Sequence, residues 1–475
     1  MSNAYPLEPD ADEMRRLVDE AMRRIVPHIE SLPQQPASSV EDATAFAKSI
    51  IEPEVPERGE DYGRLLDFVF DELVPRSFNA PGPGYLAYIP GGGIFHAAVA
   101  DLIANAVNRY TGVCAAAPAL VQIESNVIRW LCRILGYPDS SGCILTTGGS
   151  LANFTAIVTA RKELLGDDLH RGAIYTSDQV HHSVAKAANL AGFPYSAVRE
   201  IATDARFRIR LDDLEEAILA DRAEGFRPFL LVGSAGTTNS GAVDDLDALA
   251  DLAARERLWF HVDGAYGAPF VLTARGAAVM RGIDRADSVT LDPHKALFLP
   301  YGTGALLVRD REALRRAHSL HAEYLPEMQA EADLVDFCEI SPELSRDFRG
   351  LRLWLPIKMF GIGPFREALD EKLDLTIWAT EELRKIEGIE IVAEPQLTVV
   401  AFRLVRPGLS DAELDAMNRE LLDRINRRKR VMLTGTVLDG RFVIRICVVS
   451  FRTHRDRMEM GIEDIRSAVE EMMPS

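Results

Sequence analysis

Short apolar runs alternate with stretches of helical periodicity between residues 80 and 365, and this alternation limits the possible folds more than any other feature. The apolar runs have the length and composition of buried strands. Strands that alternate with helices form a mostly parallel sheet with helices on both faces. We therefore predict a large α/β domain over 80–365. Its predicted strands are 143–147, 173–176, 229–234, 259–263, 288–291 and 305–308, and its predicted helices include 151–164, 211–224 and 244–255.

The segment before this domain, residues 1–79, is predicted to be helical. Apolar side chains recur at helical spacing over 10–31, and Asp10 is a candidate N-cap. A Pro-rich break follows at 32–36. Because the segment is too thin to bury its own apolar face, we expect it to pack against another surface, such as that of a second subunit.

The segment after the large domain, residues 366–475, is predicted to form a small α+β domain. It begins with a long helix and continues with strands near 397–404 and 442–450. A helix near 456–472 closes the chain.

Composition excludes several classes of protein. The net charge of −19 argues against nucleic acid or an anionic membrane surface as the main partner. No apolar window has the length of a membrane span, and the N-terminus lacks the apolar core of a secretory signal. The five cysteines are scattered without CxxC spacing, so they indicate neither a disulfide framework nor a metal site. We expect a protein of the reducing cytoplasm.

Charged side chains follow two of the predicted strands, where ligands of open α/β sheets bind. Lys295 ends the apolar run from Ser288. A long charged side chain such as that of lysine is rarely buried unless it has a function. Burial favours the uncharged amine, which is the nucleophile in Schiff-base chemistry. Asp263 is the last residue of another predicted strand, and a buried carboxylate needs a cation such as a protonated pyridine nitrogen. Taken singly, Lys295 is also compatible with a surface loop and Asp263 with an N-cap.

Other predicted strands end in groups that suit a ring and a phosphate. Gly149 and Ser150 open a helix, where glycine and free N–H groups form an anion cradle. His181 is suited to stack on a flat ring, Thr238 to contact a ligand, and the small Ala265 to leave room for a ring. Each has an ordinary structural alternative. Together with Lys295 and Asp263, however, they supply what pyridoxal 5′-phosphate (PLP) requires.

The chain resembles the group II PLP-dependent decarboxylases, in the branch that contains aromatic-L-amino-acid, histidine and glutamate decarboxylases. The resemblance is carried by Asp-Pro-His-Lys ending at Lys295, His-Val-Asp-Gly-Ala-Tyr around Asp263, Ser-Asp-Gln-Val-His ending at His181, and Gly-Thr-Thr at 236–238. It implies the type I fold of PLP enzymes, with a mostly parallel seven-stranded central sheet. It also implies a homodimer with the active site at the subunit interface.

The resemblance assigns roles to individual residues. Lys295 is expected to form the internal aldimine with the cofactor, Asp263 to pair with the pyridinium nitrogen, and His181 to stack on the ring. The full set expected to contact the cofactor is Gly149, Ser150, His181, Thr238, Asp263, Ala265, Asp292, His294 and Lys295. Tyr324, 29 residues after Lys295, is expected to protonate Cα of the substrate from a loop that closes over the site. A phenylalanine there is associated with aldehyde-forming relatives.

The resemblance also implies that Tyr88, Ile89 and Pro90 line the side-chain pocket of the substrate. A pocket that is apolar and roomy favours an aromatic L-amino acid. The predicted reaction is decarboxylation to the amine and CO2. Decarboxylation of an acidic or aliphatic amino acid is an open alternative, as is an aldehyde synthase or aminotransferase on the same fold. A non-catalytic interaction protein on this fold is the alternative from another class.

Overall fold

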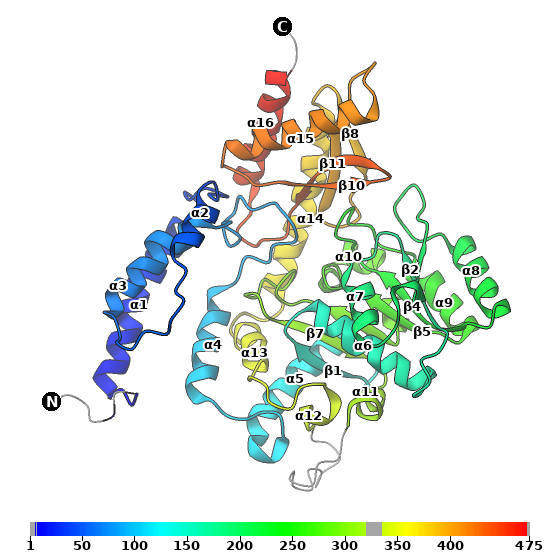
Figure 1. Cartoon of the computed structure of the whole chain (residues 1–475), viewed down its shortest axis with the longest axis horizontal. Helices are drawn as coiled ribbons and strands as arrows, with labels where there is room; N and C mark the ends of the chain where they lie inside the picture. Colours follow the sequence, from blue (N-terminus) through cyan, green and yellow to red (C-terminus); the bar gives the residue numbers. More distant parts are fainter. Residues whose placement is uncertain (1–4, 6, 320–334, 473–475) are drawn as a thin grey trace.

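The computed structural model describes residues 5, 7–319 and 335–472. Its centre is a seven-stranded sheet in the order β1-β7-β6-β5-β4-β2-β3 (Figure 1). Strand β7 is antiparallel to both of its neighbours, and all remaining neighbouring strands are parallel to each other. The predicted α/β class and mostly parallel sheet are confirmed. The strands are β1 (Gly142–Thr146), β2 (Gly172–Ser177), β3 (Val198–Ile201), β4 (Arg227–Ser234), β5 (Trp259–Asp263), β6 (Ser288–Leu291) and β7 (Gly304–Val308).

Helices cover both faces of this sheet, because successive residues of each strand point to opposite faces. Leu145 and Leu231 pack in one core cluster, while their neighbours Ile144 and Leu230 pack in another. The first cluster includes residues of α5, α9 and α13, and the second includes residues of α6, α7 and α11. These helices and α8 are α5 (Pro118–Ile134), α6 (Gly149–Leu164), α7 (Ser183–Leu190), α8 (Leu211–Ala223), α9 (Leu246–Glu256), α11 (Arg311–His318) and α13 (Gly350–Phe360).

The C-terminal part forms a second, antiparallel sheet in the order β10-β11-β9-β8. Its strands are β8 (Ile389–Ala393), β9 (Val399–Leu404), β10 (Thr434–Leu438) and β11 (Arg441–Cys447). Three helices pack with it in one apolar cluster: α14 (Gly363–Arg384), α15 (Asp411–Arg427) and α16 (Arg455–Met472). Helix α15 begins with a capping box in which Ser410 and Glu413 satisfy each other's backbone N–H groups.

The N-terminal helices lie beside one another, apart from the central sheet (Figure 1). Helix α1 (Ala11–Ser31) begins at the predicted N-cap, since the Asp10 carboxylate accepts from the backbone N–H groups of residues 12 and 13. Helices α2 (Ala43–Ser49) and α3 (Tyr62–Asp67) follow, and Arg24 of α1 pairs with Asp67 at 2.6 Å. No residue of α1 is buried within the chain.

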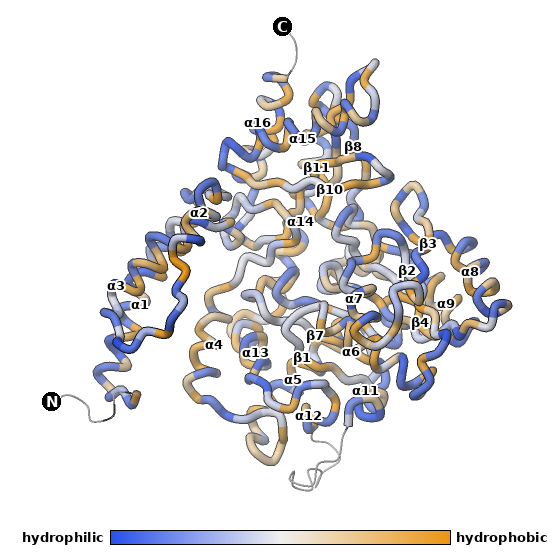
Figure 2. Tube along the Cα trace, viewed as in Figure 1, coloured by the Kyte–Doolittle hydropathy of each residue, from blue (hydrophilic) through white to orange (hydrophobic). Residues whose placement is uncertain are grey.

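Apolar residues concentrate in the strands and helices around the central sheet, and a further apolar stretch lies between α2 and α3 (Figure 2). In that stretch Ile51 and Val55 are largely exposed. Among the described residues, no helix combines the length and apolar character that crossing a membrane requires.

Candidate active site

All nine residues predicted to contact the cofactor line one cavity of about 310 Å3. The cavity lies at the carboxyl ends of β1, β2, β4, β5 and β6, where open α/β sheets bind ligands. Further lining residues include Thr147, Gly148, Asn153, Ser183, Thr237 and Tyr266. The structure therefore brings the predicted cofactor residues together.

Lys295 reaches the cavity from the turn that follows β6. The Lys295 N–H donates to the Asp292 carbonyl at 2.9 Å, which closes the turn. Its Nζ lies 3.1 Å from Oδ2 of Asp292, a carboxylate that is 2% exposed. The other carboxylate oxygen, Oδ1, is buried and has no hydrogen-bond partner within the described part of the chain. A buried acceptor without a donor indicates a site built for a further group.

His294, between these two residues, has a defined protonation state. Its Nδ1 lies 2.6 Å from the Thr303 carbonyl, which can only accept, so Nδ1 carries the hydrogen. Nε2 then carries the lone pair of the neutral ring, and this atom lies 3.7 Å from Oδ2 of Asp292. Burial lowers the pKa of His294, so the ring is neutral at pH 7.

Asp263 occupies the last position of β5 and is 9% exposed. Its Oδ1 accepts the Ala265 N–H at 3.2 Å, and its Oδ2 accepts an N–H of the Asn153 amide at 3.0 Å. Both oxygens of this buried carboxylate therefore accept a hydrogen bond from an N–H group. The arrangement offers a fixed negative charge to a cationic ring nitrogen.

Helix α6 starts at the cavity and supplies an anion cradle. Its N-cap, Gly148, makes no side-chain capping bond, and the first N–H groups of a helix have no acceptor within the helix. A Cβ on Gly149 would lie 3.0 Å from Oδ2 of Asp292 and 3.3 Å from Cβ of Ala265, so glycine keeps this wall open. Together with the amine of Lys295 and the carboxylate of Asp263, this cradle fits the phosphate, aldehyde and ring nitrogen of PLP.

His181 lies in the loop after β2, half-buried at the cavity wall. Its Nδ1 is 2.8 Å from Oγ of Ser183 and also accepts the Ser183 backbone N–H at 3.3 Å. Nδ1 is therefore the acceptor, and the neutral ring carries its hydrogen on Nε2. Burial lowers the pKa of His181, which favours that neutral form.

The predicted substrate-pocket residues and the predicted proton donor are not among the described residues that line this cavity. Tyr88, Ile89 and Pro90 do not line this cavity, and Tyr88 is 52% exposed. Their segment nevertheless continues into the turn of Lys295, since a Cβ on Gly91 would lie 2.0 Å from the His294 carbonyl oxygen. Tyr324 lies outside the described residues.

Asn153 is a site residue that the sequence prediction missed. It lies on α6, one helical turn after Gly149, so it shares the face of the helix that meets the cavity. A polar amide inside the run Leu151-Ala-Asn-Phe154 was the available signal. Ser183 was missed as well, although it follows His181 by two residues.

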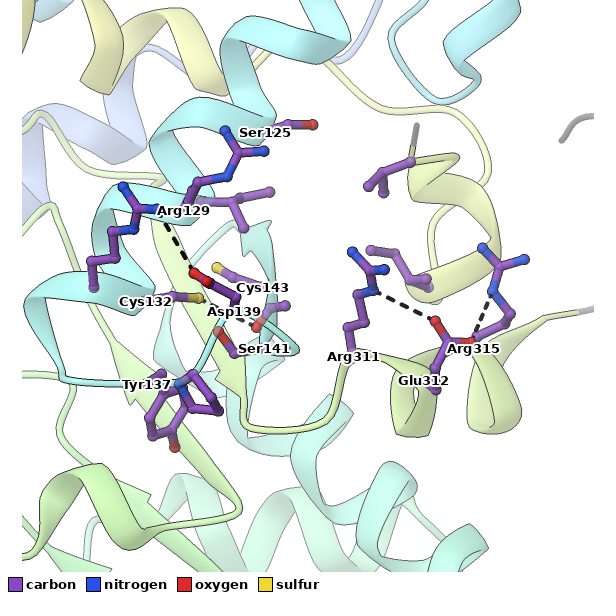
Figure 3. Close-up of a pocket in the computed structure, with 16 residues that line it drawn as sticks. Ser125, Arg129, Cys132, Tyr137, Asp139, Ser141, Cys143, Arg311, Glu312 and Arg315 are labelled. Atoms are coloured by element: carbon purple, nitrogen blue, oxygen red, sulfur yellow. Dashed lines mark hydrogen bonds and ion pairs between the residues drawn. The ribbon is translucent and has the colours of Figure 1, made fainter. Parts of the chain in front are cut away.

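A larger cavity, of about 550 Å3, lies at the opposite end of β1 (Figure 3). Gly142 and Cys143 line it, whereas the residues that follow the carboxyl end of β1 line the smaller cavity. Figure 3 shows Arg129 and Arg311 on opposite sides of this space. Burial raises the pKa of Cys132 to about 11, so this thiol is protonated at pH 7. None of the predicted site residues borders this cavity, and we assign the chemistry to the smaller one.

Comparison with known proteins identifies the family. The model of the "Pyridoxal-dependent decarboxylase conserved domain" matches residues 46–405. Aromatic-L-amino-acid decarboxylase of Bacillus atrophaeus is 36% identical over 468 residues, 98% of this chain and 97% of that protein. Cysteine sulfinic acid decarboxylase of Mus musculus is 31% identical over 404 residues, 83% of this chain and 82% of that protein. The crystal structure of Oryza sativa TDC with PLP and tryptamine superposes with a TM-score of 0.93 at 28% identity, covering 99% and 100% of the two chains. Because the family model matches most of this chain, the chain belongs to the pyridoxal-dependent decarboxylases and is a PLP-dependent carboxy-lyase.

Proposed function

We propose that this enzyme converts an aromatic L-amino acid to the corresponding amine and CO2. The observation that carries the proposal is the single cavity in which Lys295, Asp263 and the start of α6 meet. PLP, when bound, supplies an electron sink for the pair of electrons left at Cα when CO2 departs. The protein's contribution is to hold that ring, orient the substrate and move protons.

Each end of the cofactor has a proposed holder. The α6 N–H groups of Gly149 and Ser150, with Thr238, are proposed to bind the phosphate. Asp263 is proposed to hold the hydrogen on the ring nitrogen, and the amine of Lys295 to bond to the aldehyde carbon. In support, all five residues border one cavity.

The remaining cavity residues are proposed to shape and orient. His181 is proposed to cover one face of the ring, with its Nε2–H directed by the bonds that Nδ1 accepts from Ser183. Ala265 leaves room beside Asp263, and Asp292 holds Lys295 in place through the 3.1 Å ion pair. The Nε2 lone pair of His294 offers a further acceptor in the cavity.

Tyr324 is proposed to deliver the proton that Cα needs after CO2 leaves. A positioned acid is required at that step. The resemblance to the family's decarboxylases supports this residue, because it implies a tyrosine with this role 29 residues after the lysine. Protonation of Cα is what makes the product an amine.

An aromatic substrate is supported by the 36% identity to the Bacillus atrophaeus enzyme and by the likeness to a structure that holds tryptamine. Tyr88, Ile89 and Pro90 are proposed to line the side-chain pocket. The 31% identity to the mouse cysteine sulfinic acid decarboxylase is the observation that keeps an acidic substrate as the second candidate.

We also propose that two chains form a homodimer with the active site at their interface. Helix α1 buries no residue within its own chain, and the contacting helices α4 (Phe95–Val107) and α13 both carry exposed apolar side chains. These exposed residues are Leu102, Ile103, Val107, Met359 and Phe360. The burial of such a surface is a typical reason for association.

In this arrangement the chain divides into three parts. Residues 1–79 are proposed to pack on the partner, 80–365 to hold the cofactor, and 366–475 to form the small domain. A cytoplasmic location is proposed as well, because all five cysteines are free thiols, as a reducing compartment requires.

The test is the product formed by the PLP-loaded enzyme from each standard amino acid, DOPA and 5-hydroxytryptophan. We expect amine and CO2 from aromatic substrates at the highest kcat/KM. Amine from cysteine sulfinate or glutamate in preference would support the second candidate. A keto acid or an aldehyde as the main product would contradict simple decarboxylation.

A further inference from the structure

The amide of Asn153 is fully hydrogen-bonded in the protein interior, directly behind Asp263. The residue is 1% exposed. Its Nδ2 donates to Oδ2 of Asp263 at 3.0 Å and to Oγ of Ser183 at 3.0 Å. Its Oδ1 accepts from Oγ1 of Thr290 at 2.7 Å and lies 3.0 Å from Nε2 of His261. Both hydrogens and both lone pairs of the amide are therefore in use.

The direction of these bonds is fixed by Asp263. An ionised carboxylate can only accept, so the nitrogen of the Asn153 amide must face it and the oxygen must face His261. His261 therefore carries a hydrogen on Nε2. Its Nδ1, 2.8 Å from Oγ of Ser288, accepts the serine hydroxyl. Ser288 in turn accepts the indole N–H of Trp259 at 2.8 Å.

A single line of donors thus runs from Trp259 through Ser288, His261 and Asn153 to Asp263. Its members are buried, and burial lowers the pKa of His261 to about 4, which keeps the ring neutral at working pH. A protonated His261 would place a hydrogen on Nδ1 and remove the acceptor of the Ser288 hydroxyl. The line is complete only with a neutral ring.

The second hydrogen of the amide links the same residue to His181. Ser183 accepts it on Oγ, which leaves its own hydroxyl hydrogen for Nδ1 of His181 at 2.8 Å. One amide therefore contacts Asp263 directly and His181 through Ser183. This buried network therefore ends on two residues that line the cavity.

We propose that Asn153, oriented by His261, is a positioning residue that keeps the proton shared by Asp263 and the cofactor on the ring nitrogen. Asn153 has this role only if Asp263 holds the ring nitrogen, as proposed above. A hydrogen bond donated to a carboxylate stabilises its ionised form. Without it, the carboxylate competes better for the shared proton, and the ring becomes a weaker electron sink. A donor such as His261 on the far side polarises the amide and strengthens its N–H bond to Asp263.

The test uses the dimeric PLP-loaded enzyme reconstituted with PLP that carries 15N at the ring position, because the 15N chemical shift reports protonation of that atom. In Asn153→Ala we expect the signal to move toward the unprotonated position. We expect kcat to fall about tenfold to a hundredfold, as for loss of a hydrogen bond to a charged group. KM should change little, because the amide does not line the proposed side-chain pocket.

A second pair of variants keeps the test decisive if Asn153→Ala does not fold. His261→Phe removes the donor to Asn153, whereas His261→Gln retains an N–H near the position of Nε2. We expect the signal to move in His261→Phe and to stay near its wild-type position in His261→Gln. Equal signals in the two variants would overturn the proposal.

The matched control is Asn418→Ala in the small domain. Asn418 is also fully buried, and its amide bonds to the backbone of Leu404 and Leu414. We expect this variant to lose thermal stability while the 15N signal and kcat stay unchanged. If Asn153→Ala behaves in the same way, its role is structural only and the proposal is wrong. If the wild-type ring nitrogen is already unprotonated, the proposed role of Asp263 fails first, and the inference about Asn153 fails with it.

Discussion

Asp263 and Lys295 line the same cavity from adjacent strands of the central sheet. Asp263 is the last residue of β5 and lies opposite Thr290 of β6, while Lys295 follows in the turn after β6. The carboxylate and the amine that are proposed to hold two positions of one aromatic ring are therefore placed by neighbouring parallel strands. The proposed chemistry depends on this pairing.

Replacing Lys295 by Ala is expected to abolish decarboxylation and the visible absorbance of the bound cofactor, because the amine that bonds to the aldehyde carbon is removed. Absorption spectra of the purified variant measure this directly. Lys186→Ala is the matched control, since Lys186 is exposed and does not line the cavity. Wild-type absorbance in the Lys295 variant would place the covalent bond elsewhere.

Asp263→Asn is expected to keep the cofactor bound through Lys295 but to lower kcat by roughly a hundredfold or more, as when a fixed charge is lost at a reacting centre. The amide preserves the shape of the carboxylate and removes its charge. Absorbance confirms occupancy, and release of labelled CO2 gives kcat. A kcat within a few-fold of wild type would show that the ring nitrogen needs no anionic partner.

Tyr324→Phe is expected to reduce amine formation, because Cα loses its proton donor while CO2 release continues. In air, dissolved O2 is expected to take the two electrons left at Cα, so that with water the new products are aldehyde, ammonia and hydrogen peroxide. Chromatography of the reaction mixture quantifies the aldehyde beside the amine. Tyr195→Phe serves as the control, since Tyr195 is 63% exposed and does not line the cavity. An unchanged yield of amine would remove the role of Tyr324.

Acid is expected to destabilise the fold through His261. Its pKa in the folded chain is about 4, below the ordinary 6.5, chiefly because of burial. The unfolded chain therefore binds a proton below pH 6.5 that the folded chain takes up only near pH 4, so stability is full above pH 6.5 and falls below it. At pH 4.5 this ring alone should cost about 2 to 3 kcal/mol relative to pH 7.

Urea denaturation of the wild type and of His261→Gln at pH 7 and pH 4.5 measures that difference. The fall in free energy of unfolding should be smaller in His261→Gln by the amount given above. His170→Gln, at an exposed position, should behave as the wild type does. A fall of equal size in all three proteins would show that other groups cause the acid sensitivity.

The proposed dimer predicts that charge on α4 separates the subunits. Leu102→Glu places a carboxylate on an apolar surface that includes Ile103 and Val107, and burying that charge is costly. Light scattering after size exclusion should report a smaller species and lower activity. Leu219→Glu on α8 is the control, at a similarly exposed leucine. If Leu102→Glu dimerises as the wild type does, the interface lies on another surface.

The strands at the centre of the sheet were predictable because parallel strands covered on both faces are continuously apolar. Strand β3 was missed, since it lies at the edge and carries the charged pair Arg199 and Glu200. In the small domain β8 and β10 were missed for a similar reason, because most of their residues are only half-buried.

The site was predictable wherever a residue lies at the end of a strand, because the order of the strands in the sheet then determines which residues lie close together. Lys295, Asp263 and His181, which line one cavity, were predicted as site residues in this way. Asn153 was not predicted, because its position depends on the rotation of α6 against the sheet. An asparagine in a helix also has many common structural roles that involve no ligand. The role proposed for Asn153 rests on the four bonds made by its side chain.

The most direct measurement is borohydride reduction of the PLP-loaded enzyme followed by peptide mapping with mass spectrometry. Reduction fixes the cofactor to the nitrogen that holds it. The account predicts one pyridoxyl-modified residue, Lys295. Modification of another lysine, or no modification in an enzyme that still releases CO2, would contradict it.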